Sequence, residues 1–234
     1  MEAVPRYALY FAPRPETALA QFGARWLGWD LDRGETVDAT ETAGLAAGIH
    51  AAVTAEPRRY GVHATLKAPF RLAAGATEGD LLGAAARFAT ERAPLATAPL
   101  RFGPLASFLA FTPSEWSSRL HDLAGDCVTA FDEFRAPPTD AELARRRRAG
   151  LSAAQEMLLA RWGYPYVMGE FRFHMTLTGS LESTLRSEVA EALQPRLRHL
   201  LAEPLAVEDL VLCVETTADA GFRVLRRLPF SAHA

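Results

Sequence analysis

Two short runs in this chain repeat the pattern His-x-Thr-Leu. One is "HATL" at residues 63–66 and the other is "HMTL" at residues 174–177, in a chain with only 6 histidines. An imidazole can give or take a proton near neutral pH, and a threonine hydroxyl can bind a phosphate oxygen. The repeat therefore indicates acid and base chemistry, and a phosphate is the group on which both side-chain types would act.

Both runs lie in segments that have the alternating pattern of β-strands. In "YGVHATLKAPF" (60–70), strand alternation predicts one polar face, made of His63, Thr65 and Lys67. In "EFRFHMTLTGS" (170–180), it predicts a second polar face, made of Arg172, His174, Thr176 and Thr178. Neither face carries a carboxylate. If the two strands lie side by side, these side chains would form an anion-binding site.

Two imidazoles on opposite sides of a phosphorus atom can act as one general base and one general acid. A single histidine on a strand more often has a structural role, but two copies on equivalent faces make this alternative the weaker one. A metal site is disfavoured because no nearby Asp, Glu or Cys completes a ligand set. We therefore expect catalysis without a metal or any other cofactor. We find neither a nucleophile elbow nor a glycine-rich phosphate-binding loop.

Lys67 is the only lysine among 25 basic residues, and all the others are arginine. It is either an accident of an arginine-rich composition or a position that needs a compact ammonium group. Its place two residues after Thr65 favours a cation that binds the substrate. The run Arg145–Arg148 has two interpretations as well, a solvated helix face or a patch for an anionic partner.

The composition is typical of a soluble globular protein. Hydrophobic residues make up 49%, charged residues 23%, and the net charge is -3, which argues against extended nucleic-acid binding. Cys127 and Cys213 are far apart and fit a reducing cytoplasm. No leader segment and no membrane-spanning run are apparent, so we expect a cytoplasmic protein.

The periodicity predicts an α+β chain in which one order of elements occurs twice. We expect helices at 15–29, 41–53, 77–93, 114–134, 139–163 and 181–201, and strands at 6–13, 60–70, 98–104, 107–114, 170–180, 205–216 and 222–230. A strand with His-x-Thr-Leu, a helix and a hairpin follow each other in both halves. We interpret the chain as one two-lobed domain over residues 1–234. Its expected parts are a first lobe core at about 55–113, a helical insertion at about 114–165, a second lobe core at about 166–230, and residues 1–54 packed on the lobes.

With its paired motifs, the chain resembles the two-histidine (2H) phosphoesterase superfamily, in which each of two lobes carries one His-x-Thr/Ser-hydrophobic motif. The surrounding words "RYALYFAP", "YGVHATLKAPF" and "GEFRFHMTLTG" are similar to a bacterial branch encoded within phosphonate-degradation operons. The resemblance covers most of the chain. It is carried by the pair of motifs, since either copy alone is a weak signal.

The resemblance implies a bilobal, duplicated α+β fold, with two mainly antiparallel sheets facing a central cleft and helices outside. It implies metal-independent opening of cyclic phosphodiesters of ribose, with His63 and His174 catalytic and Thr65 and Thr176 binding phosphate. Lys67, Arg172 and Thr178 are added as phosphate-binding residues from strand alternation alone. The phosphonate setting suggests a ribosyl 1,2-cyclic phosphate as substrate. Two alternatives remain: RNA-end processing or 2′,5′ RNA ligation, and a non-catalytic nucleotide- or phosphate-binding protein.

Overall fold

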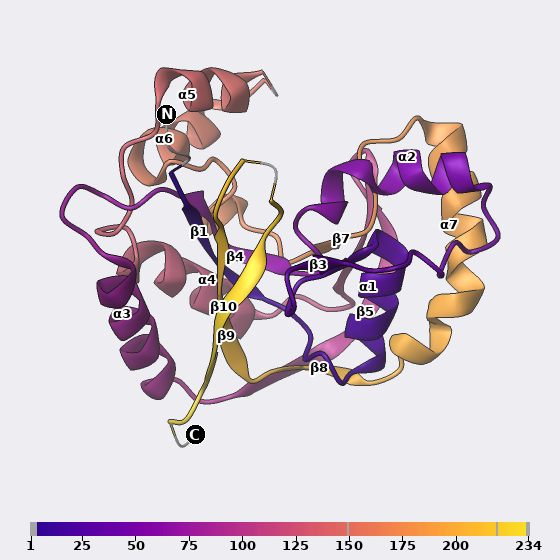
Figure 1. Ribbon diagram of the computed structural model, residues 1–234, viewed down its shortest axis with the longest axis horizontal. Coiled ribbons are helices and arrows are strands. Elements are labelled where there is room, and N and C mark those ends of the chain that lie inside the picture. Colours follow the sequence, from indigo (N-terminus) through magenta and orange to yellow (C-terminus); the bar gives the residue numbers. More distant parts are fainter. Residues whose placement is uncertain (1–3, 149, 219, 233–234) are drawn as a thin grey trace.

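The computed structural model describes residues 4–148, 150–218 and 220–232 (Figure 1). The α-helices are α1 (Ala18–Leu27), α2 (Ala47–Arg58), α3 (Glu78–Thr90), α4 (Ser118–Ala130), α5 (Asp140–Arg147), α6 (Ala153–Trp162) and α7 (Ser183–Leu197). The strands are β1 (Arg6–Phe11), β2 (Trp29–Asp30), β3 (Glu35–Thr36), β4 (Ala64–Phe70), β5 (Leu95–Leu105), β6 (Phe108–Pro113), β7 (Met175–Thr176), β8 (Pro204–Val207), β9 (Asp209–Glu215) and β10 (Arg223–Pro229). Short 3-10 turns occupy Met168–Glu170 and Arg198–Leu200.

Two four-stranded antiparallel sheets form the framework. Their strand orders are β10-β9-β1-β4 and β7-β6-β5-β8, and β2 pairs with β3 in a separate ribbon. Figure 1 shows α3 and α4 beside the first sheet, and α1, α2 and α7 on the opposite side of the molecule. The expected mixture of helices with antiparallel sheets is confirmed.

The strands do not pair in the order in which they follow one another along the chain. The hairpin of β5 and β6, which we placed with the first motif in a lobe core at about 55–113, pairs with β7 and β8. Strands β9 and β10 join the sheet that contains β1 and β4. Periodicity shows which face of a strand is buried, but it does not show which distant strand completes the sheet.

Both faces of the first sheet are buried near β1. Tyr7, Leu9 and Phe11 face a large core that also contains helices α3 and α4, whereas Ala8 and Tyr10 face a smaller cluster around Trp29 and Phe222. This alternation follows directly from the strand period of two. The face with Tyr10 is the one on which the first histidine lies.

Several predicted elements are interrupted. The predicted helix at 139–163 is two helices, because Gly150 has a φ of 72° and Ser152 starts a new helix by capping α6; residue 149 lies outside the described residues. The predicted strand at 205–216 divides into β8 and β9, which belong to different sheets. The predicted strand at 170–180 is regular only at Met175–Thr176.

Other predictions are confirmed closely. Thr77 caps α3 with a capping box that includes Asp80, and the two strands after α3 form the predicted hairpin. Among the described residues, no helix is both long and apolar enough to span a membrane.

Candidate active site

His63 stands immediately before β4, at the end of a tight turn. Gly61 has a φ of 63°, a conformation that glycine adopts without strain. Its carbonyl accepts a hydrogen bond from Nδ1 of His63 at 3.0 Å. The turn therefore fixes the direction of the imidazole ring.

His174 stands in the same way before β7. Its Nδ1 donates to the carbonyl of Arg172 at 2.7 Å, again two residues earlier in the chain. A carbonyl only accepts hydrogen bonds, so Nδ1 carries the proton in both rings and Nε2 is left with a lone pair when the ring is neutral. The two histidines thus present the same nitrogen for chemistry.

The two motifs are brought close together. β4 and β7 contact each other although they belong to different sheets, and both lie near the middle of the molecule in Figure 1. Burial and, to a smaller extent, the nearby imidazole of His174 lower the pKa of His63 to about 4, although the hydrogen bond to Gly61 partly opposes this shift. Burial also lowers the pKa of His174. Both imidazoles are therefore neutral at pH 7 in the free protein.

Aromatic rings hold both imidazoles. The Tyr10 ring stacks on His63 with centroids 3.9 Å apart, and Tyr60 lies 6.1 Å from the same ring. Phe108 lies 5.6 Å from His174. Tyr10 is fully buried, and its hydroxyl has no hydrogen-bond partner among the described residues. The sequence analysis did not predict a role for Tyr10. Its aromatic side chain in the first strand gave no sign that it would stack on His63.

The two motif threonines are partly exposed. The Oγ1 of Thr65 lies 3.2 Å from Nε2 of His63, so the hydroxyl donates to the neutral ring. Thr176 pairs with Ala110 of β6, at the edge of the second sheet. A phosphate bound beside the imidazoles would find a hydroxyl on the strand of each motif.

Lys67 does not share the face of His63 and Thr65, contrary to the prediction. Thr65 pairs with Tyr10, and Lys67 pairs with the residue just before it in β1, Leu9. A β-bulge therefore breaks the alternation between Thr65 and Lys67. The Lys67 ammonium is buried, donates to the carbonyl of Val128 at 2.9 Å and lies 3.5 Å from Asp132.

Thr178 is also turned away from any bound phosphate. It is fully buried, its Oγ1 accepts from the backbone N–H of Leu109 at 3.0 Å, and it donates to the carbonyl of Gly179 at 2.9 Å. The hydroxyl replaces a ladder bond where β7 ends. Arg172, in contrast, is exposed and lines a pocket near His174.

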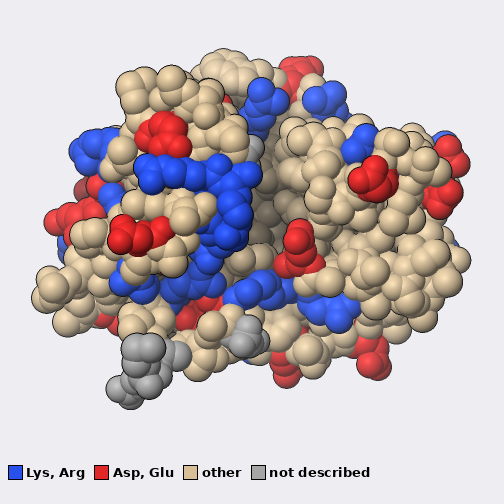
Figure 2. Space-filling model, turned by 90° about the horizontal axis from the view of Figure 1, so that it is seen from above, with Lys and Arg blue, Asp and Glu red and all other residues tan. Residues whose placement is uncertain are grey.

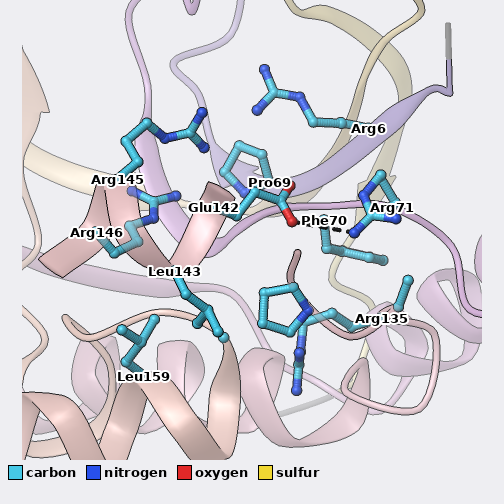
Figure 3. Close-up of a pocket in the computed structure, with 13 residues that line it drawn as sticks. Arg6, Pro69, Phe70, Arg71, Arg135, Glu142, Leu143, Arg145, Arg146 and Leu159 are labelled. Carbon is cyan, nitrogen blue, oxygen red and sulfur yellow. Dashed lines mark hydrogen bonds and ion pairs between the residues drawn. The ribbon is translucent and has the colours of Figure 1, made fainter. Parts of the chain in front are cut away.

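A separate pocket is lined by arginines from four parts of the chain (Figure 3). Figure 3 shows Arg6, Arg145 and Arg146 around one side of it, with Glu142 between them and Arg71. Arg71 pairs with Glu142 at 3.2 Å. The pocket reaches Phe70, at the end of β4 far from His63, so roughly 20 Å of strand separates it from the histidines.

One face of the molecule is hollowed. Figure 2 shows a depression near the centre of one face, with Lys and Arg side chains along one side of it. Within the described part of the chain, no group of three or more His, Cys, Asp or Glu residues is placed to hold a metal ion.

Comparison with known proteins shows the family. A family model described as "Protein of unknown function (DUF1045)" matches residues 65–223, a segment that includes Thr65 and the whole second motif. The chain belongs to the DUF1045 family.

Two relatives of this DUF1045 chain are each named ribose 1,5-bisphosphate phosphokinase PhnN. The protein from Janthinobacterium sp. (strain Marseille) is 41% identical over 98% of the chain, and the one from Laribacter hongkongensis (strain HLHK9) is 39% identical over 94%. The similarity covers 52% and 51% of these two proteins. The chain thus spans about half the length of the relatives it matches.

The contacts of Thr178 predict a structural role that can be measured. Thr178→Val keeps the shape but leaves the Leu109 N–H buried without an acceptor, so the free energy of unfolding should fall by about 1–3 kcal/mol. Urea unfolding measures this change. Thr90→Val is the matched control, because the exposed Thr90 hydroxyl bonds only the Arg87 carbonyl. Equal stabilities for the two variants would contradict the role of Thr178.

The low pKa values predict a response to anions. Sulfate bound between the imidazoles would favour their charged forms, since a unit charge about 4 Å away is worth ~4 kcal/mol near a protein surface. His63 should therefore titrate near pH 4 in the free protein and at least about one pH unit higher in sulfate. NMR of the ring carbons follows each histidine. His50, whose Nε2 bonds the Trp26 carbonyl, is the internal control. Titration of His63 that is unchanged by saturating sulfate would show that the anion binds elsewhere.

Proposed function

We propose that this chain is a cyclic phosphodiesterase that opens a small ribose-type cyclic phosphate by two-histidine acid and base catalysis without a metal. The observation that carries the proposal is the matched pair of imidazoles, each bound through Nδ1 to the carbonyl two residues earlier. In this proposal the two sheets are the halves of a two-lobed 2H phosphoesterase fold. The depression in Figure 2 is the opening of its cleft.

The reaction follows from the Nε2 atoms of the two imidazoles, each of which has a lone pair when its ring is neutral. One neutral imidazole takes a proton from water as the water oxygen bonds to phosphorus. The other imidazole is protonated when the anionic substrate binds. It gives its proton to the leaving ester oxygen of the cyclic phosphate as the bond between that oxygen and phosphorus breaks. The product is a phosphate monoester and a free hydroxyl group, with one water consumed. Thr65 and Thr176 bind the non-bridging oxygens, where charge increases in the transition state.

The relatives' names support a ribose phosphate as the substrate class. Opening a ribosyl 1,2-cyclic phosphate at the P–O2 bond gives a ribose 1-phosphate, and the relatives are named for ribose 1,5-bisphosphate. The sole lysine of the chain follows Leu66, so the Gly-Lys pair of a phosphate-binding loop does not occur in these residues. We therefore assign the kinase activity in those names to the other half of the relatives, and place this chain beside it in phosphonate catabolism.

Replacing either histidine tests the mechanism. His63→Gln and His174→Gln should each lower kcat for a ribosyl cyclic phosphate by about two to four orders of magnitude, the usual value of a positioned acid or base. Phosphorus NMR follows the ring opening, with EDTA present throughout. His199→Gln, at an exposed histidine outside the site, should leave the rate unchanged. Loss of wild-type activity in EDTA and its recovery with one divalent ion would contradict the metal-free mechanism.

The threonines should act on transition-state binding. Thr65→Val and Thr176→Val remove one hydroxyl each and should lower kcat/KM by the equivalent of about 1–3 kcal/mol. The same NMR assay measures the effect, with Thr90→Val as a control of equal chemistry on a distant helix. Unaltered kinetics in both motif variants, with the fold intact, would mean that these hydroxyls do not touch the phosphate.

A further inference from the structure

A pocket of ≈ 270 Å³ lies on the second sheet, at the start of α4. Two arginines from different elements line it, Arg101 of β5 and Arg172 of the segment before β7. Aromatic side chains form part of its wall, with the Trp116 and His121 rings 6.4 Å apart and the His121 and Phe171 rings 6.0 Å apart. Trp116 is 78% exposed, which is unusual for a large aromatic side chain.

The strand register places this pocket beside the second motif. Thr176 pairs with Ala110 and Met175 with Phe111, so one step further along β6 puts Thr112 opposite His174. Thr112 pairs in turn with Arg101, whose Nε donates to its hydroxyl at 3.2 Å. Directly paired residues share a face of the sheet. Arg101 therefore stands on the same face as Thr176, two strands away from His174.

The cations of this pocket are available to a ligand. Within the described residues, neither Arg101 nor Arg172 forms an ion pair with a carboxylate, and both side chains are exposed. The terminal nitrogens of Arg101 extend beyond its bond to Thr112. The first turn of the thirteen-residue helix α4 borders the same space and adds the positive end of its dipole. Glu115 is the one carboxylate in the lining and opposes this charge.

We propose that this pocket is a subsite for a second phosphate group, so that the substrate is a ribose cyclic phosphate that also carries a phosphate monoester. The inference rests on the proposed cyclic phosphodiesterase activity. The cyclic phosphate lies between the imidazoles, and the sugar extends along the sheet to bring its second phosphate to Arg101 and Arg172. A guanidinium fork binds the oxygens of a phosphate monoester in pairs. The relatives are named for a ribose that carries two phosphates, ribose 1,5-bisphosphate.

The other cations of the chain do not fit this role. Lys67 is buried on the opposite face of β4 against Val128 and Asp132. The arginine pocket of Figure 3 lies roughly 20 Å of strand away from His63, too far for one sugar to bridge. Arg145 in that pocket is therefore a useful control, since Arg145→Met removes one exposed charge of the same kind at a distance.

The test compares ribosyl 1,2-cyclic phosphate with and without a 5-phosphate. Arg101→Met and Arg172→Met should each raise KM for the 5-phosphorylated ester by roughly 10- to 100-fold, the value of a charge-assisted hydrogen bond, with kcat nearly retained. The rise for the unphosphorylated ester should be much smaller. Glu115→Gln should lower KM for the 5-phosphorylated ester. Arg145→Met should change KM for either ester only by a small factor, because it acts through the overall charge alone.

Two results separate the subsite from the activity. If Arg101→Met and Arg172→Met impair both esters equally, the second-phosphate subsite is wrong and the phosphodiesterase stands. If the wild-type protein opens neither ester, the proposed activity is wrong, and titration calorimetry with ribose 5-phosphate then decides the subsite. Binding that Arg101→Met abolishes and Arg145→Met preserves supports it. Equal binding by wild type and Arg101→Met, or none by either protein, overturns it.

Discussion

The hydrogen bond from each imidazole Nδ1 to the carbonyl two residues earlier is the interaction on which the site depends. It fixes the tautomer, and with it the nitrogen that faces a ligand. It also requires a carbonyl that no neighbouring strand uses. Gly61 meets this requirement in a turn with a positive φ, and Arg172 meets it in a segment that is not part of a regular strand. The irregular backbone before each motif is thus part of how the site is built.

Each sheet combines strands from distant parts of the chain, which explains how two motifs 111 residues apart in the sequence are held near each other in space. The sheet beside His63 contains the first strand and the last two strands of the chain, and the sheet that carries the second motif contains the hairpin after α3. Neither sheet can form from one half of the sequence. The chain passes from one sheet to the other between β4 and β5 and again between β8 and β9. A movement of one sheet would therefore displace strands of the other. This constraint suits a reaction that needs two groups on opposite sides of one phosphorus atom.

The sequence was most informative where a side chain has a simple periodic environment. Alternation placed Ala64 and Leu66 in the core and Thr65 on the opposite face, and Thr77 capped its helix as predicted. Alternation failed at Lys67, because one extra residue in a bulge reverses every later side chain. It failed at Thr178, because a buried hydroxyl there replaces a backbone partner. Both failures come from pairing with a distant strand, which a single-strand pattern does not contain. The partner of His63, Tyr10, was invisible for the same reason.

The position of Lys67 explains why one lysine stands in a chain of arginines. Val128 is among the last four residues of α4, whose carbonyls have no partner within the helix. A compact ammonium reaches that carbonyl in a space closed by the core, and Asp132 balances its charge while also binding Arg135 at 2.8 Å. Burial lowers the pKa of Lys67 to about 8, which Asp132 partly opposes, so the group is mostly charged at pH 7. A guanidinium is larger and planar and does not fit the same enclosed position. Near His174 the opposite holds, because Arg101 and Arg172 border open space where a fork of donors can bind two oxygens at once. Each cation therefore matches the size of its site. The sole lysine stabilises the fold. The cations beside the second motif are arginines, which have room to bind a ligand.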